Sequence, residues 1–161
     1  MKTLVLGLGN TLLQDEGVGI AAMNAVRAQH GESEGLAFVD GGTLSFALAG
    51  PIAEADALIV LDAAELDAAP GTVRCWIGEA MDRFLGSSRK RSVHEVGLLD
   101  LMALALLDDR LPARRALIAV QPETIAWGET LSPAVAAAVA LMCEHAARLI
   151  GRWRDLDLGE H

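Results

Sequence analysis

Short, continuously apolar runs recur along the chain and alternate with longer alanine-rich segments. Such runs are typical of strands buried on both faces, and a helix-length segment between two of them predicts a parallel crossover. We therefore expect an α/β fold, a three-layer α/β/α sandwich around a mostly parallel, twisted five-stranded sheet. The predicted strands are Thr3–Leu8, Leu36–Val39, Ala57–Leu61, Thr72–Ile77 and Ala116–Val120.

The segments between these strands predict helices. The stretch "AAELDAAPG" before Thr72 is too short for a crossover helix, so the strand that follows it is expected to be an antiparallel edge. A length of 161 residues fits one compact core, and we expect residues 1–161 to form a single domain. The predicted helices run from about Gly17 to Gln29, Leu44 to Ala55, Glu79 to Leu85, His94 to Leu107 and Pro133 to Trp153.

The charge and apolar content of the chain limit its partners and location. A net charge of −9 disfavours binding to nucleic acid or to an anionic membrane, because the basic cluster at 89–91 is short. The apolar stretch Ala134–Ile150 carries three ionisable side chains, which favours an amphipathic helix over a membrane span. Cys75 and Cys143 lie far apart and are interpreted as core thiols of a reducing compartment. We expect a cytoplasmic protein with neither nucleic acid nor membrane as partner.

Acidic groups follow most of the predicted strands. Glu16 follows the first strand, the "DGGT" segment from Asp40 to Thr43 follows the second, Asp62 follows the third, and Glu123 follows the last. Ligands of a parallel sheet bind beyond the carboxyl ends of its strands, where the loops converge. The sequence therefore predicts an acidic site at this edge.

His94 is expected to join this site from a helix. In "SVHEVGL", Ser92 and Glu95 have the spacing of a capping box, which puts His94 in the first turn of the helix that it opens. The positive end of the helix dipole disfavours an imidazolium there and so keeps a lone pair for a metal. Together with Glu16 and Asp62, this ring would make an incomplete metal shell that leaves positions for water or substrate.

Other interpretations of these motifs remain open. The turn "GLGNTL" matches two glycines of a dinucleotide fingerprint, but Leu12 replaces the third, and Asp15 with Glu16 would repel a pyrophosphate. This disfavours a nucleotide-binding or flavodoxin-like domain. Asp62 alone also fits a helix N-cap or turn residue, and His94 alone fits a structural role. Trp127 fits either a packing lid or a surface that faces a bound peptide.

Five segments together resemble the hydrogenase maturation endopeptidases: "LGLGNTLLQDEGVG", "VDGGT", "LIVLDA", "HEVGL" and "VQPETIAWGETLSP". The resemblance spans nearly the whole chain, with the segments in the order and spacing of that family. It implies an endopeptidase that removes a short C-terminal extension from the large-subunit precursor of a nickel–iron hydrogenase after the metal centre has been loaded.

The resemblance also implies residue roles. Glu16, Asp62 and His94 match the nickel-recognition positions, and Gly41, Gly42 and Thr43 belong to a segment associated with substrate recognition. The nickel is expected to come with the precursor and not to bind tightly to the free enzyme.

The sequence favours metal-assisted hydrolysis. It shows neither a nucleophile elbow nor a Ser-His-Asp or Cys-His arrangement, which leaves a metal-dependent or aspartyl-type endopeptidase with Asp40 as the candidate proton acceptor. Mixed carboxylate and imidazole ligands do not specify the metal, so nickel rests on the resemblance. The alternative is a non-catalytic nickel-sensing chaperone of hydrogenase assembly that uses the same residues.

Overall fold

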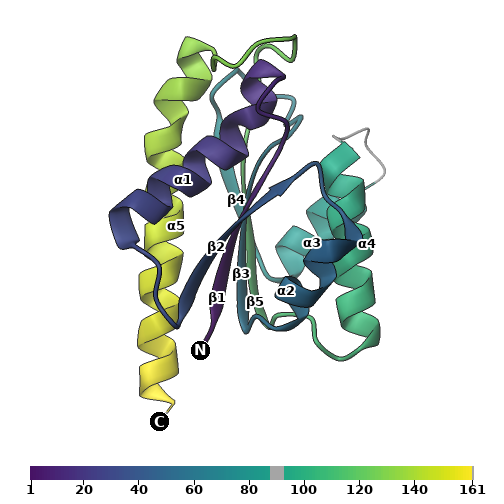
Figure 1. Cartoon of the computed structure of the whole chain (residues 1–161), viewed down its shortest axis with the longest axis vertical. Helices are drawn as coiled ribbons and strands as arrows, with labels where there is room; N and C mark the ends of the chain where they lie inside the picture. Colours follow the sequence, from purple (N-terminus) through teal and green to yellow (C-terminus); the bar gives the residue numbers. More distant parts are fainter. Residues whose placement is uncertain (88–92, 161) are drawn as a thin grey trace.

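A single five-stranded sheet, with strand order β2-β1-β3-β5-β4, runs through the structure (Figure 1). This computed structural model describes residues 1–87 and 93–160, except for the side chains of residues 93–96. Four strands are parallel, and β4 pairs antiparallel with β5 at one edge, as the short connection before it predicted. The strands are β1 (Thr3–Leu8), β2 (Leu36–Gly42), β3 (Ala57–Ala63), β4 (Val73–Ile77) and β5 (Arg114–Val120).

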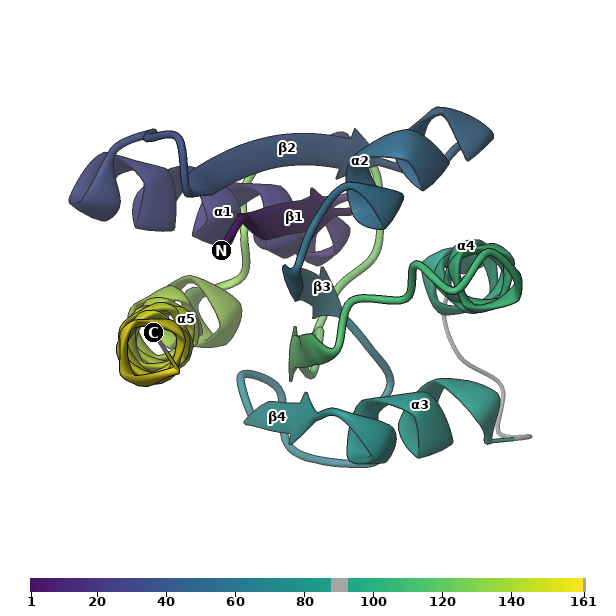
Figure 2. The same cartoon turned by 90° about the horizontal axis from the view of Figure 1, so that it is seen from below.

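Helices cover both faces of the sheet, which confirms the predicted three-layer sandwich (Figures 1 and 2). One layer holds α1 (Val18–His30) and α5 (Pro133–Gly159). The other holds α2 (Ala49–Ala53), α3 (Glu79–Gly86) and α4 (Val93–Leu107). Two short 3-10 turns, η1 (Gln14–Gly17) and η2 (Phe46–Leu48), precede α1 and α2.

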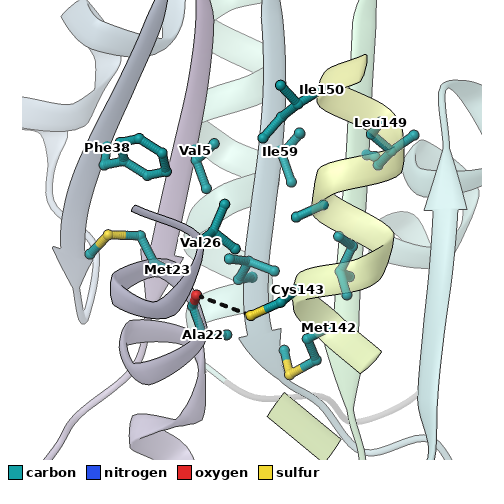
Figure 3. Packing of buried hydrophobic residues seen from close by; sticks show 14 of the residues in the cluster. Val5, Ala22, Met23, Val26, Phe38, Ile59, Met142, Cys143, Leu149 and Ile150 are labelled. Atoms are coloured by element: carbon teal, nitrogen blue, oxygen red, sulfur yellow. Dashed lines mark hydrogen bonds between the residues drawn. The ribbon is translucent and has the colours of Figure 1, made fainter. Parts of the chain in front are cut away.

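Burial on both faces explains why the strands are continuously apolar. Along β3, Ile59 and Leu61 belong to the core cluster against α1 and α5, while Leu58 and Val60 belong to the cluster on the opposite face. Figure 3 shows the first cluster, in which the Cys143 thiol donates a weak hydrogen bond to the Ala22 carbonyl oxygen at 3.9 Å. Burial raises the pKa of the Cys143 thiol, and both cysteines are free, as predicted.

Helix α5 is long and apolar enough to cross a membrane by those two criteria alone. A core helix of a soluble protein meets the same criteria. Side chains at a helical spacing along α5 are buried, among them Met142, Ala146, Leu149 and Trp153, and the first cluster includes them. We therefore interpret α5 as an amphipathic core helix, as the sequence predicted.

The segment after β2 differs from its prediction. Strand β2 continues to Gly42, so Asp40 pairs with Gly7 and Gly42 with Leu8, with a register shift at Gly41, instead of forming a loop. The helix predicted from Leu44 to Ala55 is reduced to η2 and the five residues of α2. Leu44 has a φ of 68° and so cannot lie within a right-handed helix. Ser45 is extended and forms the N-cap of η2, so the helical segment begins only at Phe46. The predicted capping box of Ser92 and Glu95 lies outside the described residues.

Gly19 tests how closely α1 must approach the sheet. A Cβ at this position would lie 2.2 Å from the Leu8 carbonyl oxygen and 2.3 Å from that of Leu61. Gly19→Ala should therefore lower the free energy of unfolding by about 3 kcal/mol, because backbone atoms must move apart.

Gly151→Ala is the matched control. Gly151 is an exposed residue of α5 with nothing within 4 Å of the added Cβ. This variant should raise the free energy of unfolding by about 0.5 kcal/mol, since alanine restricts the unfolded chain more. Urea denaturation measures both variants, and equal effects would contradict the close approach of α1 to β1 and β3.

Candidate active site

Several acidic segments gather at the carboxyl ends of the parallel strands. Turn η1 follows β1, Asp62 lies next to the last residue of β3, and the segment 121–132 follows β5. Helix α4 begins at the same end of the sheet, because the connection that follows it leads into the amino end of β5 (Figure 1). The structure thus gathers at one edge the elements that carry the predicted site.

Asp15 is fully buried, with an exposed fraction of 0%. Its Oδ2 accepts hydrogen bonds from the backbone N–H groups of Glu123 at 2.9 Å and Thr124 at 3.0 Å. Ser132 donates its N–H to Oδ1 and its hydroxyl to Oδ2, both at 2.7 Å. Burial alone would raise the pKa of Asp15, but these hydrogen bonds together hold the pKa below its ordinary value. The charged carboxylate therefore fastens the loop after β5 to the turn after β1.

Glu16 has a different environment from its neighbour. It is half-buried in η1, and η1 contacts β3, the strand that carries Asp62. The close packing of this turn depends on Gly9, which has a φ of 131°, because a Cβ there would lie 1.8 Å from the Glu16 carbonyl oxygen. The glycine therefore has a packing role in bringing Glu16 to the end of the sheet.

Asp62 is almost completely buried inside β3, with an exposed fraction of 1%. It follows Leu58 and Val60 in the strand alternation and so faces the layer that contains α4. Its Oδ1 accepts a hydrogen bond from the Ala63 N–H at 2.8 Å. Since the residue lies within a strand, its interpretation as a helix cap or turn residue is wrong. Among the described side chains, Asp15 and Asp62 are the buried carboxylates, and burial of such a charge requires hydrogen-bond donors or a cation.

His94 lies in the first turn of α4, at the end of the sheet where β3 ends. Its side chain is outside the described residues, so the convergence of Glu16, Asp62 and His94 stays a prediction. The side chains that the structure does describe contain no group of three or more histidine, cysteine, aspartate or glutamate residues placed to hold a metal. A site with three protein ligands at this edge would therefore take a ligand from outside those side chains, and His94 is the predicted one.

Asp40 is exposed, and its Oδ1 accepts a hydrogen bond from the Gly42 N–H at 2.9 Å. Strand β1 lies between β2 and β3, and its Gly7 pairs with Asp40 of β2 and with Leu61 of β3. Asp62 is the residue after Leu61. Two strand spacings, or about 10 Å, thus separate the backbones of the two aspartates. Because side chains alternate along a strand, Asp40 lies on the same face of the sheet as Phe38, which is the face opposite to that of Asp62. Its role as proton acceptor stays a prediction, as does substrate binding by Gly41, Gly42 and Thr43.

Gln121 was not predicted as a structural residue of this edge. Its buried side chain accepts a hydrogen bond from the Leu66 N–H at 2.6 Å and donates to Glu65 Oε2 at 3.1 Å. It thereby holds the connection between β3 and β4 beside the end of β5. The available signal in the sequence was an amide side chain directly after an apolar strand.

A wide hollow of about 700 Å³ lies at the opposite end of the sheet. Charged groups lining it pair with one another, because the Met1 amino group is 3.2 Å from Asp157 Oδ2 and Arg114 Nη2 is 3.4 Å from Glu160 Oε1. Its size does not make it the site, since the buried carboxylates and the strand carboxyl ends are elsewhere.

Known proteins are similar to this chain in both sequence and fold. The family model HycI, described as hydrogenase maturation protease, matches residues 20–149. The chain belongs to the hydrogenase maturation protease family. It is 35% identical over 153 residues to the hydrogenase expression/formation protein HupD of Rhodobacter capsulatus, an alignment that covers 94% of the protease and 72% of HupD. It is 32% identical over 140 residues to the hydrogenase 2 maturation protease of Escherichia coli, covering 86% and 84% of the two chains.

Solved structures agree with this assignment. The hydrogenase maturating endopeptidase HybD from E. coli superposes with a TM-score of 0.86 at 30% identity, covering 94% of each chain. The [NiFe] hydrogenase maturation protease HybD from Thermococcus kodakarensis gives 0.79 at 31% identity, covering 92% of this protease and 99% of that chain. The resemblance inferred from the sequence is confirmed, and the chain is a peptidase of this family.

Asp15→Asn should destabilise the protease by about 3 kcal/mol at neutral pH. The carboxylate accepts hydrogen bonds through both oxygens, whereas the amide of asparagine would point an NH₂ donor at the N–H groups on one side. The substitution also removes the charge that strengthens these bonds. The lowered pKa sets the pH dependence: the contribution of Asp15 is complete above its unfolded pKa of about 3.9 and is lost as the pH falls through the lower folded value.

Denaturation of the wild type and Asp15→Asn between pH 7 and pH 3 checks this. The difference in the free energy of unfolding should be constant at higher pH and shrink on acidification below about pH 4. A difference that grew on acidification would contradict the assigned role of the Asp15 carboxylate.

Proposed function

We propose that this protease removes a C-terminal extension from the large-subunit precursor of a nickel–iron hydrogenase after nickel insertion. The observation that carries the proposal is the buried carboxylate of Asp62 at the carboxyl end of β3, facing the layer of the helix that His94 opens. The names of the relatives, a hydrogenase expression/formation protein and a hydrogenase 2 maturation protease, support hydrogenase as the substrate.

The precursor's own nickel serves as the recognition element in this proposal. Glu16, Asp62 and His94 offer two carboxylates and one imidazole, a donor set that accepts several divalent metals. Because these three groups leave the shell incomplete, the precursor supplies the remaining ligands and the free protease binds nickel weakly. Selectivity for a loaded precursor then comes from ligands on both partners.

Hydrolysis needs no covalent intermediate at this site. The oxygen of a water molecule bonds to the scissile carbonyl carbon, and the bond from that carbon to the amide nitrogen breaks. Asp40 stays the candidate acceptor of the proton from the attacking water, which would pass from it to the departing amine. Its backbone lies about 10 Å from that of Asp62, on the other side of β1, so the scissile bond would have to lie between the two strand ends. The substrate's metal polarises the carbonyl, while Glu16 and Asp62 hold the loaded precursor in place.

The charge and thiols of the protease support its proposed setting. A net charge of −9 supports a partner other than nucleic acid or an anionic membrane surface. The free thiols of Cys75 and Cys143 support a reducing cytoplasm, where the precursor would be processed.

The mass of a nickel-loaded precursor, incubated with wild-type or variant protease, tests this proposal. Wild-type protease should remove one defined C-terminal peptide. Asp62→Asn should slow this processing by about 100-fold, because the amide keeps the size of the side chain but loses the charge that attracts the cation. His94→Ala should abolish processing, and both variants should melt near the wild type.

Asp56→Asn is the matched control for Asp62→Asn. Asp56 is an exposed residue just before the amino end of β3, so the same substitution removes one charge at the other end of the same strand. It should process precursor at the wild-type rate. An unchanged precursor mass with wild-type protease would favour the nickel-sensing chaperone, and equal rates for the two variants would remove Asp62 from the site.

A further inference from the structure

A second hollow lies beside the segment that follows β2. Its volume is about 430 Å³, and its walls come from the residues after Gly42 and from the middle of α4. This volume is within the range of small-ligand pockets and fits a short piece of peptide. Its lining includes the apolar residues Leu44, Phe46 and Leu101, together with Gly97 and Asp100.

The backbone beside this hollow is strained in a way that shapes it. Leu44 has a φ of 68°, a left-handed conformation that is unfavourable for a leucine. Its side chain packs against α4 where Gly97 has none, and a Cβ on Gly97 would lie 3.1 Å from Leu44 Cδ1. The strained turn and the missing side chain together let Leu44 lie flat against the helix.

Phe46 extends the apolar wall into solvent. Its side chain is 78% exposed, although Leu48 in the same 3-10 turn is buried. A single exposed aromatic residue is ordinary, but this one lines an apolar hollow next to the proposed site. An aromatic ring in this position provides contact area for a ligand at a small cost in conformational entropy.

The position of the hollow connects it to the scissile bond. Gly97 follows His94 by three residues, on the same side of α4 and about 4.5 Å along the helix axis. An extended peptide rises about 3.3 Å per residue, so a group in the hollow would lie within about three residues of a bond held near His94. Thr43, which is itself a proposed substrate-binding residue, and Leu44 directly after it both line the hollow.

The charge of the rim defines the ligand further. Asp100 is exposed and is the charged residue among the described lining residues, in a chain with a net charge of −9. A basic group next to the bound apolar side chain would be attracted, whereas an acidic one would be repelled.

We propose that this hollow binds an apolar side chain of the precursor, within about three residues of the scissile bond and next to a basic residue. Phe46 and Leu44 are then specificity-determining residues for the peptide that is cut. This inference rests on the proposed function, because it assigns the hollow to the same substrate.

Steady-state processing of loaded precursor by Phe46→Ala tests the inference. The KM should rise about 10-fold while kcat stays within about two-fold of wild type, because the lost contact binds substrate away from the reacting atoms. Leu107→Ala is the matched control, since Leu107 is 81% exposed at the opposite end of α4. It should leave both constants unchanged.

A second variant and a changed substrate complete the test. Gly97→Ala should push Leu44 into the hollow and also raise the KM. Replacing apolar residues near the scissile bond with serine, one at a time, should identify one position where wild type loses about 10-fold in kcat/KM and Phe46→Ala loses almost nothing.

The outcomes separate this inference from the proposed function. Processing by wild type with an unchanged KM for Phe46→Ala would overturn the inference alone. Serine substitutions that affect wild type and Phe46→Ala equally would also overturn it. Failure of wild type to cut any loaded precursor would overturn the proposed function and, with it, the assignment of the hollow.

Discussion

The carboxylate of Asp15 holds the loop after β5 against the turn after β1, and the edge of the sheet depends on this connection. It accepts hydrogen bonds from three backbone N–H groups and one hydroxyl in a fully buried position. Backbone hydrogen bonds reinforce it, with Asp15 N–H donating to the Thr124 carbonyl and Gln14 N–H to that of Gly128. The next residue, Glu16, is thereby carried on a fixed turn. Such support suits the proposed role of Glu16 as a metal ligand, which requires one fixed geometry.

A second constraint is the burial of the sheet on both faces. Side chains between the layers must be apolar unless they find partners, so polar chemistry is confined to the ends of the strands. Asp62 is such a polar side chain, buried near the end of β3 on the side of α4. The same packing brings α1 onto the ends of β1 and β3 at Gly19. The glycines of the first turn thus allow close packing where a nucleotide-binding turn would hold a phosphate.

The strands and layers could be predicted because their signals are local. Continuous apolar runs identified the four parallel strands, and a short connection identified the antiparallel edge β4. Glu16 was predicted as the ligand of the acidic pair, but the structural role of Asp15 could not be predicted, because its hydrogen-bond partners lie on the distant loop after β5.

The predicted helix from Leu44 failed for a similar reason. Its residues suit a helix, but Leu44 has a positive φ and packs against Gly97. This neighbour is distant along the chain, so a local pattern could not reveal the contact. Gln121 likewise has a partner on another connection. Long-range contacts of this kind also shape the hollow at Phe46, so a sequence pattern alone could not locate it.

Nickel K-edge X-ray absorption of loaded precursor tests the central claim, that carboxylates at this edge bind the substrate's metal. Spectra would be recorded for the precursor alone and after mixing with protease, frozen before processing. Added oxygen or nitrogen ligands with wild-type protease, reduced with Asp62→Asn, are the predicted result. A nickel shell that stays unchanged in a complex shown to form would contradict the account.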